Sequence, residues 1–127
     1  TIPSSHADLL DSTALAHVAT IGPDGKPQNN PVWFGWDGTH VLFSQTTGRQ
    51  KYRNLVRHPM ATLFILDPTN PYRTIEIRSN VELTPDPEKA MVHQFADKYG
   101  VPVETLLQAG GDRVVATFDP VKVNANG

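Results

Sequence analysis

The alternation of hydrophobic and polar positions divides the first third of the chain into a short helix and a β-hairpin. Residues 4–12 (SSHADLLDS) predict a helix, because a serine can accept hydrogen bonds from first-turn amides and Ala7 and Leu10 are three positions apart. From Leu15 to Ile21 the period changes to two, which is typical of a β-strand. Residues 23–26 (PDGK) then predict a tight turn, since proline presets one backbone angle and glycine tolerates positive φ.

The middle of the chain predicts two further strands and a helix. The strands are expected at Pro27–Trp36 and His40–Ser44. The stretch RQKYRNLVRH at 49–58 has helical periodicity and ends before Pro59. This helix is expected to turn three side chains inward: Tyr52, Leu55 and Val56.

The second half of the chain predicts two long strands, a helix and a final strand. The third helix is expected to open at Pro85–Pro87 and to reach about Tyr99, with Asp86 and Glu88 in its first turn, where the helix dipole favours acids. The other expected elements are strands at Met60–Leu66 and Tyr72–Thr84, a helical turn at Val103–Leu107 and a strand at Arg113–Val123.

These elements predict a mainly β fold with inserted helices. Consecutive hairpins favour an antiparallel sheet, and the helices are too few to cover both faces of a parallel one. Closure into a small barrel would protect the strand edges. We therefore expect one small antiparallel β-barrel domain over residues 1–127.

Composition excludes several classes of protein. The chain has 127 residues and no cysteine, which rules out a disulfide framework and a cysteine-based zinc site. A net charge of -2 gives no basic excess, so nucleic acid is not an expected partner. No run approaches the ~18 apolar residues of a membrane span, and the start TIPSSHADLL lacks the layout of a signal peptide. A cytoplasmic location is expected.

The motifs of common enzyme classes are missing from the sequence. It contains no G-x-S-x-G, G-x-x-x-x-G-K-[ST], G-x-G-x-x-G or H-E-x-x-H. No two of the five histidines stand four positions apart, so no metal site is expected. The pattern identifies no catalytic residue.

One segment has the features of an anion site. Residues 38–66 contain no acidic residue and four positive side chains: Arg49, Lys51, Arg53 and Arg57. They follow Thr46 and Thr47 at an expected helix start, where free amides and hydroxyl groups suit a phosphate. The alternative is a solvated helix face whose arginines pair with acids elsewhere.

The strand QNNPVWFGW is a second candidate for a ligand contact. Asn29 and Asn30 are poor strand formers, and Pro31 cannot donate to a central ladder. A planar ligand could stack against such an interrupted strand. The alternative is an edge strand whose Trp33, Phe34 and Trp36 belong to the core.

The order of these features resembles a known family. The segments ATIGPDGKPQ, NPVWF and TTGRQKYRNLVRHPMATL resemble the flavin- and deazaflavin-dependent oxidoreductases with a split β-barrel, the pyridoxamine-phosphate-oxidase-like superfamily. The run GRQKYRNL followed by His-Pro is closest to the branch that uses coenzyme F420. The resemblance covers about Leu15 to Thr84 and, more loosely, the last strand.

The resemblance implies a homodimer of antiparallel split β-barrels with two cofactor sites at the subunit interface. The tricyclic ring would lie along the strand of Asn29, Asn30, Pro31, Val32 and Trp33, with backbone donors on the polar edge of the ring. The phosphate would be held by Thr46, Thr47, Arg49 and Lys51, with Ser44 between the two regions. The opposite subunit would contribute Tyr72 or Arg78.

The implied activity is hydride transfer between coenzyme F420 and an unsaturated or conjugated organic substrate. Flavin mononucleotide (FMN) is the alternative cofactor, since it also has a ring, a ribityl chain and a phosphate. F420 adds a tail of carboxylates, which would favour extra cations such as Arg53 and Arg57. A non-catalytic protein that binds a flavin or deazaflavin is a further alternative, because it needs the same phosphate contacts.

Overall fold

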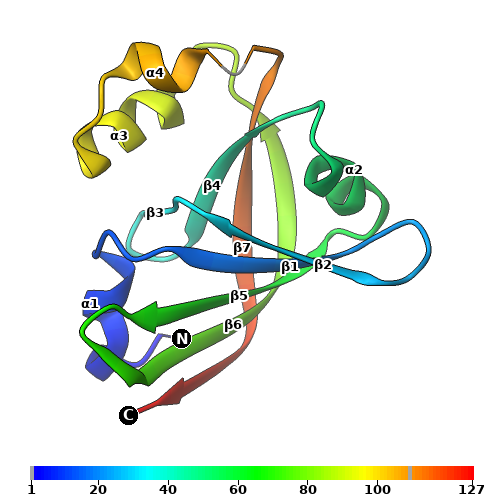
Figure 1. The fold of residues 1–127 in the computed structure, drawn as a ribbon. Helices are drawn as coiled ribbons and strands as arrows, with labels where there is room; N and C mark the ends of the chain where they lie inside the picture. Colours follow the sequence, from blue (N-terminus) through cyan, green and yellow to red (C-terminus); the bar gives the residue numbers. More distant parts are fainter. Residues whose placement is uncertain (1, 109) are drawn as a thin grey trace.

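The structure, a computed structural model that describes residues 2–108 and 110–127, is built on one strongly curled antiparallel sheet (Figure 1). The strands in the described residues are β1 (Ala16–Ile21), β2 (Pro27–Val32), β3 (Gly35–Trp36), β4 (Val41–Thr46), β5 (Met60–Asp67), β6 (Asn70–Pro85) and β7 (Arg113–Asn126). Their order across the sheet is β2-β1-β5-β6-β7-β4-β3. The expected split β-barrel is confirmed.

Short helices close the ends of the curled sheet (Figure 1). A 3-10 turn at Ser4–His6 leads into α1 (Ala7–Leu10), which lies near the β5–β6 hairpin. The other helices are α2 (Gln50–Arg57), α3 (Ala90–Tyr99) and α4 (Val103–Leu107). The α3–α4 pair lies beside β4 and covers one end of the barrel.

The core lies inside the curl, and the period-two pattern of the strands produces it. In β4, for example, Val41 and Phe43 are buried and Leu42 is only partly so. Phe43 meets Phe118 of β7 edge to face, with ring centroids 5.5 Å apart. Phe34, Leu55, Ile75 and Ile77 are also fully buried.

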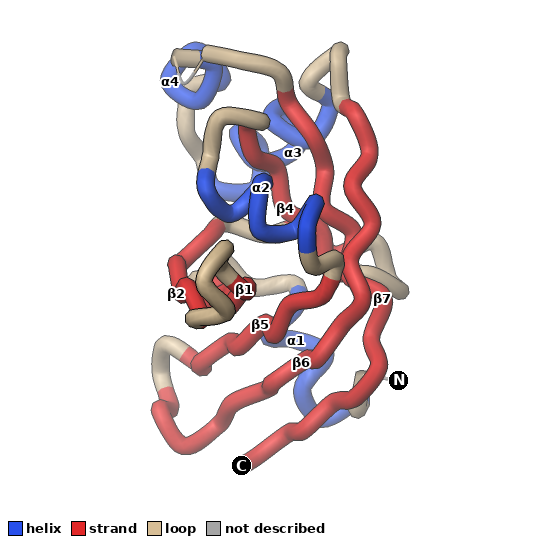
Figure 2. The backbone as a smooth tube through the Cα atoms, turned by 90° about the vertical axis from the view of Figure 1, so that its right-hand side faces the viewer, coloured by secondary structure: helices blue, strands red, loops and turns tan. Residues whose placement is uncertain are grey.

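Two long strands, β6 and β7, connect the halves of the barrel. Figure 2 shows them running side by side along the molecule. Arg78 pairs with Lys122 but Ser79 pairs with Pro120, which leaves Val121 as the extra residue of a β-bulge. Pro120 has no N–H for a ladder, so the bulge falls where a hydrogen bond is already missing. A bulge of this kind lets β7 bend from one half of the sheet to the other.

The single strand expected over Pro27–Trp36 is wrong, because the chain crosses there from one edge of the sheet to the other. Val32 pairs with Ala16 of β1, whereas Gly35 pairs with Leu42 of β4. Between them, the backbone of Phe34 is satisfied by side chains of α3. Its N–H donates to the Tyr99 hydroxyl at 3.1 Å, and its carbonyl accepts from the Lys98 ammonium at 2.7 Å.

The expected start of the third helix at Pro85–Pro87 is also wrong. Pro85 still belongs to β6 and pairs with Val114, and the helix begins at Ala90. Lys89 stands before it in the left-handed region, with φ of 60°. Asp86 therefore lies outside the first turn, where its carboxylate accepts from the amides of Ala90 at 3.0 Å and Met91 at 3.1 Å.

We predict that Asp86→Ala lowers the free energy of unfolding by about 1 kcal/mol, the usual effect of losing a side-chain cap. The matched control is Glu88→Ala, because Glu88 is exposed and makes no hydrogen bond to the amides that Asp86 caps. Urea unfolding of both variants is the measurement. Equal losses for the two would contradict a capping role for Asp86.

Candidate functional site

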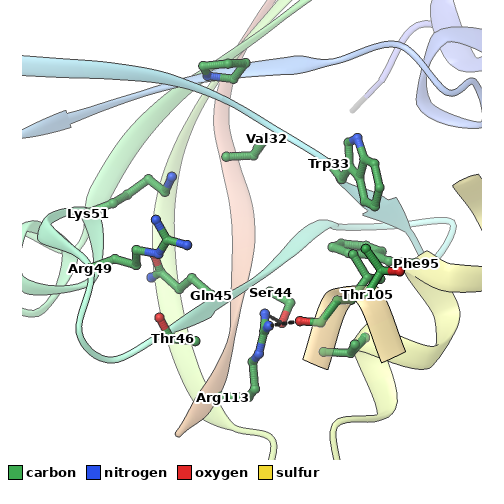
Figure 3. A pocket seen from close by; sticks show the side chains of 13 residues that line it. Val32, Trp33, Ser44, Gln45, Thr46, Arg49, Lys51, Phe95, Thr105 and Arg113 are labelled. Atoms are coloured by element: carbon green, nitrogen blue, oxygen red, sulfur yellow. Dashed lines mark hydrogen bonds between the residues drawn. The ribbon is translucent and has the colours of Figure 1, made fainter. Parts of the chain in front are cut away.

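A hollow lies in the split of the barrel, between the end of β2 and β4. It is a cavity of about 390 Å³, closed on one side by α3 and α4 (Figure 3). Its lining comprises Pro31, Val32, Trp33, Ser44, Gln45, Thr46, Arg49, Lys51, Val92, Phe95, Thr105, Leu106 and Arg113.

The strands on either side of the cavity have free edges. β4 pairs with β3 only through Val41 and Leu42, so residues 43–46 have a strand partner on one side only. β2 pairs only with β1. Backbone donors and acceptors on two facing edges are therefore available to a ligand that enters the split.

The start of α2 gives the cavity a positive end. Arg49 precedes the helix and Lys51 lies in its first turn, where backbone amides have no partner within the helix. In the described part of the chain, no carboxylate oxygen lies within 4.0 Å of either cationic group. Burial, reinforced by the charge of Arg49, lowers the pKa of Lys51. Such an end favours an anion.

Asn54, a buried residue of α2, fixes this helix to the β1–β2 hairpin. Its amide nitrogen donates to Thr20 Oγ1 at 3.0 Å and Gln28 Oε1 at 2.9 Å, and its oxygen accepts from Gln50 at 2.8 Å. The expectation that Val56 faces inward is wrong, since Val56 is 59% exposed. Asn54, a polar residue, thus faces inward where Val56 was expected, and its hydrogen bonds set the position of the helix that carries Lys51.

The opposite wall of the cavity is apolar and rigid. Trp33 stacks on Tyr99 of α3, with ring centroids 4.3 Å apart and an interplanar angle of 8°. Phe95 meets Tyr99 edge to face at 6.1 Å. Figure 3 shows Trp33 and Phe95 across the cavity from Arg49 and Lys51. The cavity is therefore matched to a molecule that has an anionic group at one end and a flat apolar part at the other.

Gln45 is an unsatisfied polar group in this cavity. It is 5% exposed, and among the described residues neither its amide nitrogen nor its amide oxygen has a hydrogen-bond partner. A buried amide without partners is costly, and because both atoms are shielded, a ligand would satisfy them only after the side chain turns into the cavity. Sequence reasoning missed Gln45, although a polar residue on the face of Val41 and Phe43 was a visible signal.

Most of the site residues expected from the sequence come together in the cavity. Those that line it are Pro31, Val32, Trp33, Ser44, Thr46, Arg49 and Lys51. Thr47 is not among them, and its backbone amide donates to the carbonyl of Asp112 at 3.1 Å. Asn30 accepts a hydrogen bond from Gln28 at 2.9 Å.

The remaining expected residues lie away from the cavity. Asn29 lines a hollow on the outer face of the sheet, as the alternation along β2 requires. Tyr72 is 85% exposed, and Arg78 pairs with Glu76 at 3.1 Å on the outer surface. A contribution from Tyr72 or Arg78 to a partner's site stays a prediction.

The structure also adds lining residues that the sequence did not point to. Apart from Gln45, these are Val92 and Phe95 of α3, Thr105 and Leu106 of α4, and Arg113 of β7.

No cluster of three or more histidine, aspartate or glutamate side chains that could hold a metal ion occurs in residues 2–108 and 110–127. Within the same ranges, every helix is too short or too polar to cross a membrane.

Comparisons with known proteins give a consistent result. Residues 2–127 match the sequence profile of the family described as pyridoxamine 5'-phosphate oxidase. A solved structure described as an F420 reductase is 37% identical, with a TM-score of 0.86 over 97% of this chain and 98% of that one. Among curated proteins, none is similar enough in sequence to count as a relative.

Two more distant structures share the fold. A conserved hypothetical protein from Mycobacterium tuberculosis is 20% identical, with a TM-score of 0.79 over 99% of this chain and 85% of that one. A haem storage protein from Vibrio cholerae is 13% identical, with a TM-score of 0.77 over 97% and 93% of the two chains.

We predict that Gln45→Leu leaves the free energy of unfolding of the free protein unchanged or raises it by about 1–2 kcal/mol, because it removes an unpaired buried amide. Asn54→Leu is the matched control, since it removes a buried amide whose hydrogen bonds are made. That variant is expected to lose about 2–3 kcal/mol. Chemical denaturation measures both, and comparable losses would mean that Gln45 has partners in the free protein.

Proposed function

The chain belongs to the pyridoxamine 5'-phosphate oxidase family, and on this premise we propose that it is an oxidoreductase that transfers a hydride between coenzyme F420 and an unsaturated or conjugated organic substrate. The observation that carries the proposal is the pair of unneutralised cations, Arg49 and Lys51, facing a rigid aromatic wall across the split.

The lining residues fit a cofactor with a phosphate, a polyol chain and a planar ring. Arg49, Lys51 and the first amides of α2 would hold the phosphate. The unpaired amide of Gln45 offers both a donor and an acceptor, which suits a hydroxyl of the chain. The ring would lie along the free edge of β2 at Pro31–Trp33.

When bound, the cofactor would supply the redox chemistry. The protein would hold its ring in position against an apolar wall. Trp33 is held by its stack on Tyr99, so the surface that faces the ring does not need to reorganise. The titratable side chains that line the cavity are Arg49, Lys51 and Arg113, and Lys51 is proposed to hold the phosphate. Arginine keeps its proton near neutral pH, so we expect solvent to deliver the proton that accompanies hydride transfer.

Two other functions use the same cavity. An FMN-dependent oxidoreductase needs the same phosphate contacts, and a non-catalytic protein that stores or carries a flavin or deazaflavin needs them too. The relative described as an F420 reductase, at 37% identity, favours F420 over FMN.

A homodimer formed through the outer face of the sheet belongs to the same proposal. That face has a hollow of about 330 Å³ lined by His17, Ala19, Asn29, Thr62, Phe64 and Leu66. Phe64 is 38% and Leu66 39% exposed, and the Nδ1 atom of His17 is buried without a partner. A second copy of the chain would cover this apolar surface and bring Asn29 into the interface.

We predict that the purified protein binds F420 more tightly than FMN in a titration followed by cofactor fluorescence. Reduced F420 should then turn over with a quinone-like or enone acceptor. Tighter binding of FMN would overturn the F420 assignment. Tight F420 binding without turnover across a broad acceptor panel would instead support the non-catalytic alternative.

Lys51→Ala serves as the internal control of this titration. It should weaken binding of both cofactors by about 1.5–3 kcal/mol, the range for a hydrogen bond to a charged group, because both carry a phosphate. Lys26→Ala removes the same charge from the exposed hairpin turn and should change neither affinity. An unaffected Lys51→Ala protein would place the phosphate elsewhere.

We also predict that Phe64→Glu converts the dimer into a monomer in analytical ultracentrifugation, because it buries a carboxylate in an apolar interface. Val56→Glu is the matched control, since Val56 is an exposed apolar residue on α2, away from the outer sheet face. A wild-type protein that sediments as a monomer would refute the dimer.

A further inference from the structure

Arg113 brings a third positive charge to the cavity, from an element far along the chain. It is the first residue of β7 and pairs with Thr46, so its side chain leaves the sheet on the face of Thr46 and Ser44. Its guanidinium donates to the carbonyl of Leu106 at 2.8 Å and, over 3.4 Å, to the hydroxyl of Ser44. These contacts hold the group at the cavity wall, where Figure 3 shows it beside Ser44.

No anion in the described chain balances this charge. No carboxylate oxygen lies within 4.0 Å of the Arg113 nitrogens, and none of the residues that line the cavity is acidic. Burial, and then the charge of Arg49, lowers the pKa of Arg113, while Asp86 acts in the opposite direction. The two contacts to neutral oxygens leave further N–H donors of the guanidinium without a partner.

Arg113 is separated from Lys51 of the proposed phosphate site by the strand β4, whereas Arg49 is close enough to act on the pKa of Arg113. The Lys51 ammonium lies over the ring of Phe43, 5.5 Å from its centroid. Phe43 and Ser44 are neighbours in β4, so their side chains point to opposite faces of the sheet. Lys51 and Arg113 thus approach the free edge of β4 from opposite sides.

The charges also suggest a second anion. A phosphate monoester carries about -1.5 to -2 at pH 7, and a phosphodiester carries less, so Arg49 and Lys51 suffice to neutralise either one. The charge of Arg113 is then left over. A single guanidinium with a nearby hydroxyl, here that of Ser44 at 3.4 Å, matches a carboxylate in charge and in its two-oxygen geometry.

We propose that Arg113 forms a second anion subsite, distinct from the phosphate site, that binds a carboxylate of the ligand. The proposal rests on the function proposed above. Two sources of the carboxylate share this chemistry: the tail of F420, or an acidic group on the organic substrate. In either case Arg113 determines which molecules the cavity accepts.

The test compares Arg113→Gln with wild type in three arms. The first two measure the affinities for F420 and for FMN, which has a phosphate but no carboxylate tail. The third measures the KM of an enone acceptor that carries a carboxylate and that of its methyl ester. Arg113→Lys, which restores the charge, and Lys26→Gln, which removes an exposed charge outside the cavity, are run beside it. Thermal melting checks that each variant is folded.

A carboxylate from the F420 tail predicts that Arg113→Gln weakens F420 binding by about tenfold or more and leaves FMN binding unchanged. A carboxylate from the substrate predicts unchanged cofactor affinities and a similar rise in KM for the acid alone. Either result supports the subsite, and Arg113→Lys should recover part of the loss.

Other outcomes overturn the subsite. Equal losses for F420 and FMN would assign Arg113 to the phosphate site, and no change in any arm would exclude it from binding. If wild type binds FMN but not F420, the F420 proposal fails while the substrate arm still decides on Arg113. If it binds neither cofactor, the proposed function and the subsite fail together.

Discussion

The rest of the structure depends on how the chain satisfies its backbone at the crossing of Trp33 and Phe34. Every buried backbone N–H and C=O needs a hydrogen-bond partner, and here the sheet cannot provide one. The chain passes here between the two edges of the sheet, and no neighbouring strand can receive the Phe34 backbone. Tyr99 and Lys98 of α3 provide the missing partners. Tyr99 also stacks on Trp33, so the residue that satisfies the crossing also builds the aromatic wall of the cavity.

The cavity combines a rigid wall with polar groups that are poorly satisfied in the free protein. Arg49, Lys51 and Arg113 have no carboxylate partner among the described residues, and Gln45 has no hydrogen-bond partner there. Asn54, by contrast, is buried with its hydrogen bonds made, whereas His17 Nδ1 and Ser79 Oγ are the buried side-chain atoms outside the cavity that lack a partner among the described residues. A ligand with groups that match the three cations and Gln45 would therefore stabilise the folded protein by binding in the cavity.

The sequence could predict what depends on neighbours along the chain. The period of two, the PDGK turn and the acid-free run around Arg49 and Lys51 are local, and the structure retains all three as strands, a turn and a helix start with two cations near it. The position of the break between β2 and β3 was not predictable from the pattern, because residues 27–36 alternate as one strand and only the distant side chains of α3 interrupt them. Arg113 was equally hidden, since its pairing with Thr46 joins strands that are far apart in sequence.

The cap formed by α3 and α4 is inserted between two strands that pair directly with each other. Pro85 at the end of β6 pairs with Val114 of β7, and the amide of Asp86 donates to the carbonyl of Arg113 at 2.8 Å. The hydrogen bonds between β6 and β7 therefore continue up to the point where the inserted segment leaves the sheet. The pairing of these two strands does not depend on how long that segment is. Relatives could lengthen or shorten the loops of the cap and so change the range of accepted substrates without redesigning the sheet, provided that α3 keeps the partners of the Phe34 backbone. For engineering, the segment between Pro85 and Arg113 is therefore the part of the chain to exchange between relatives.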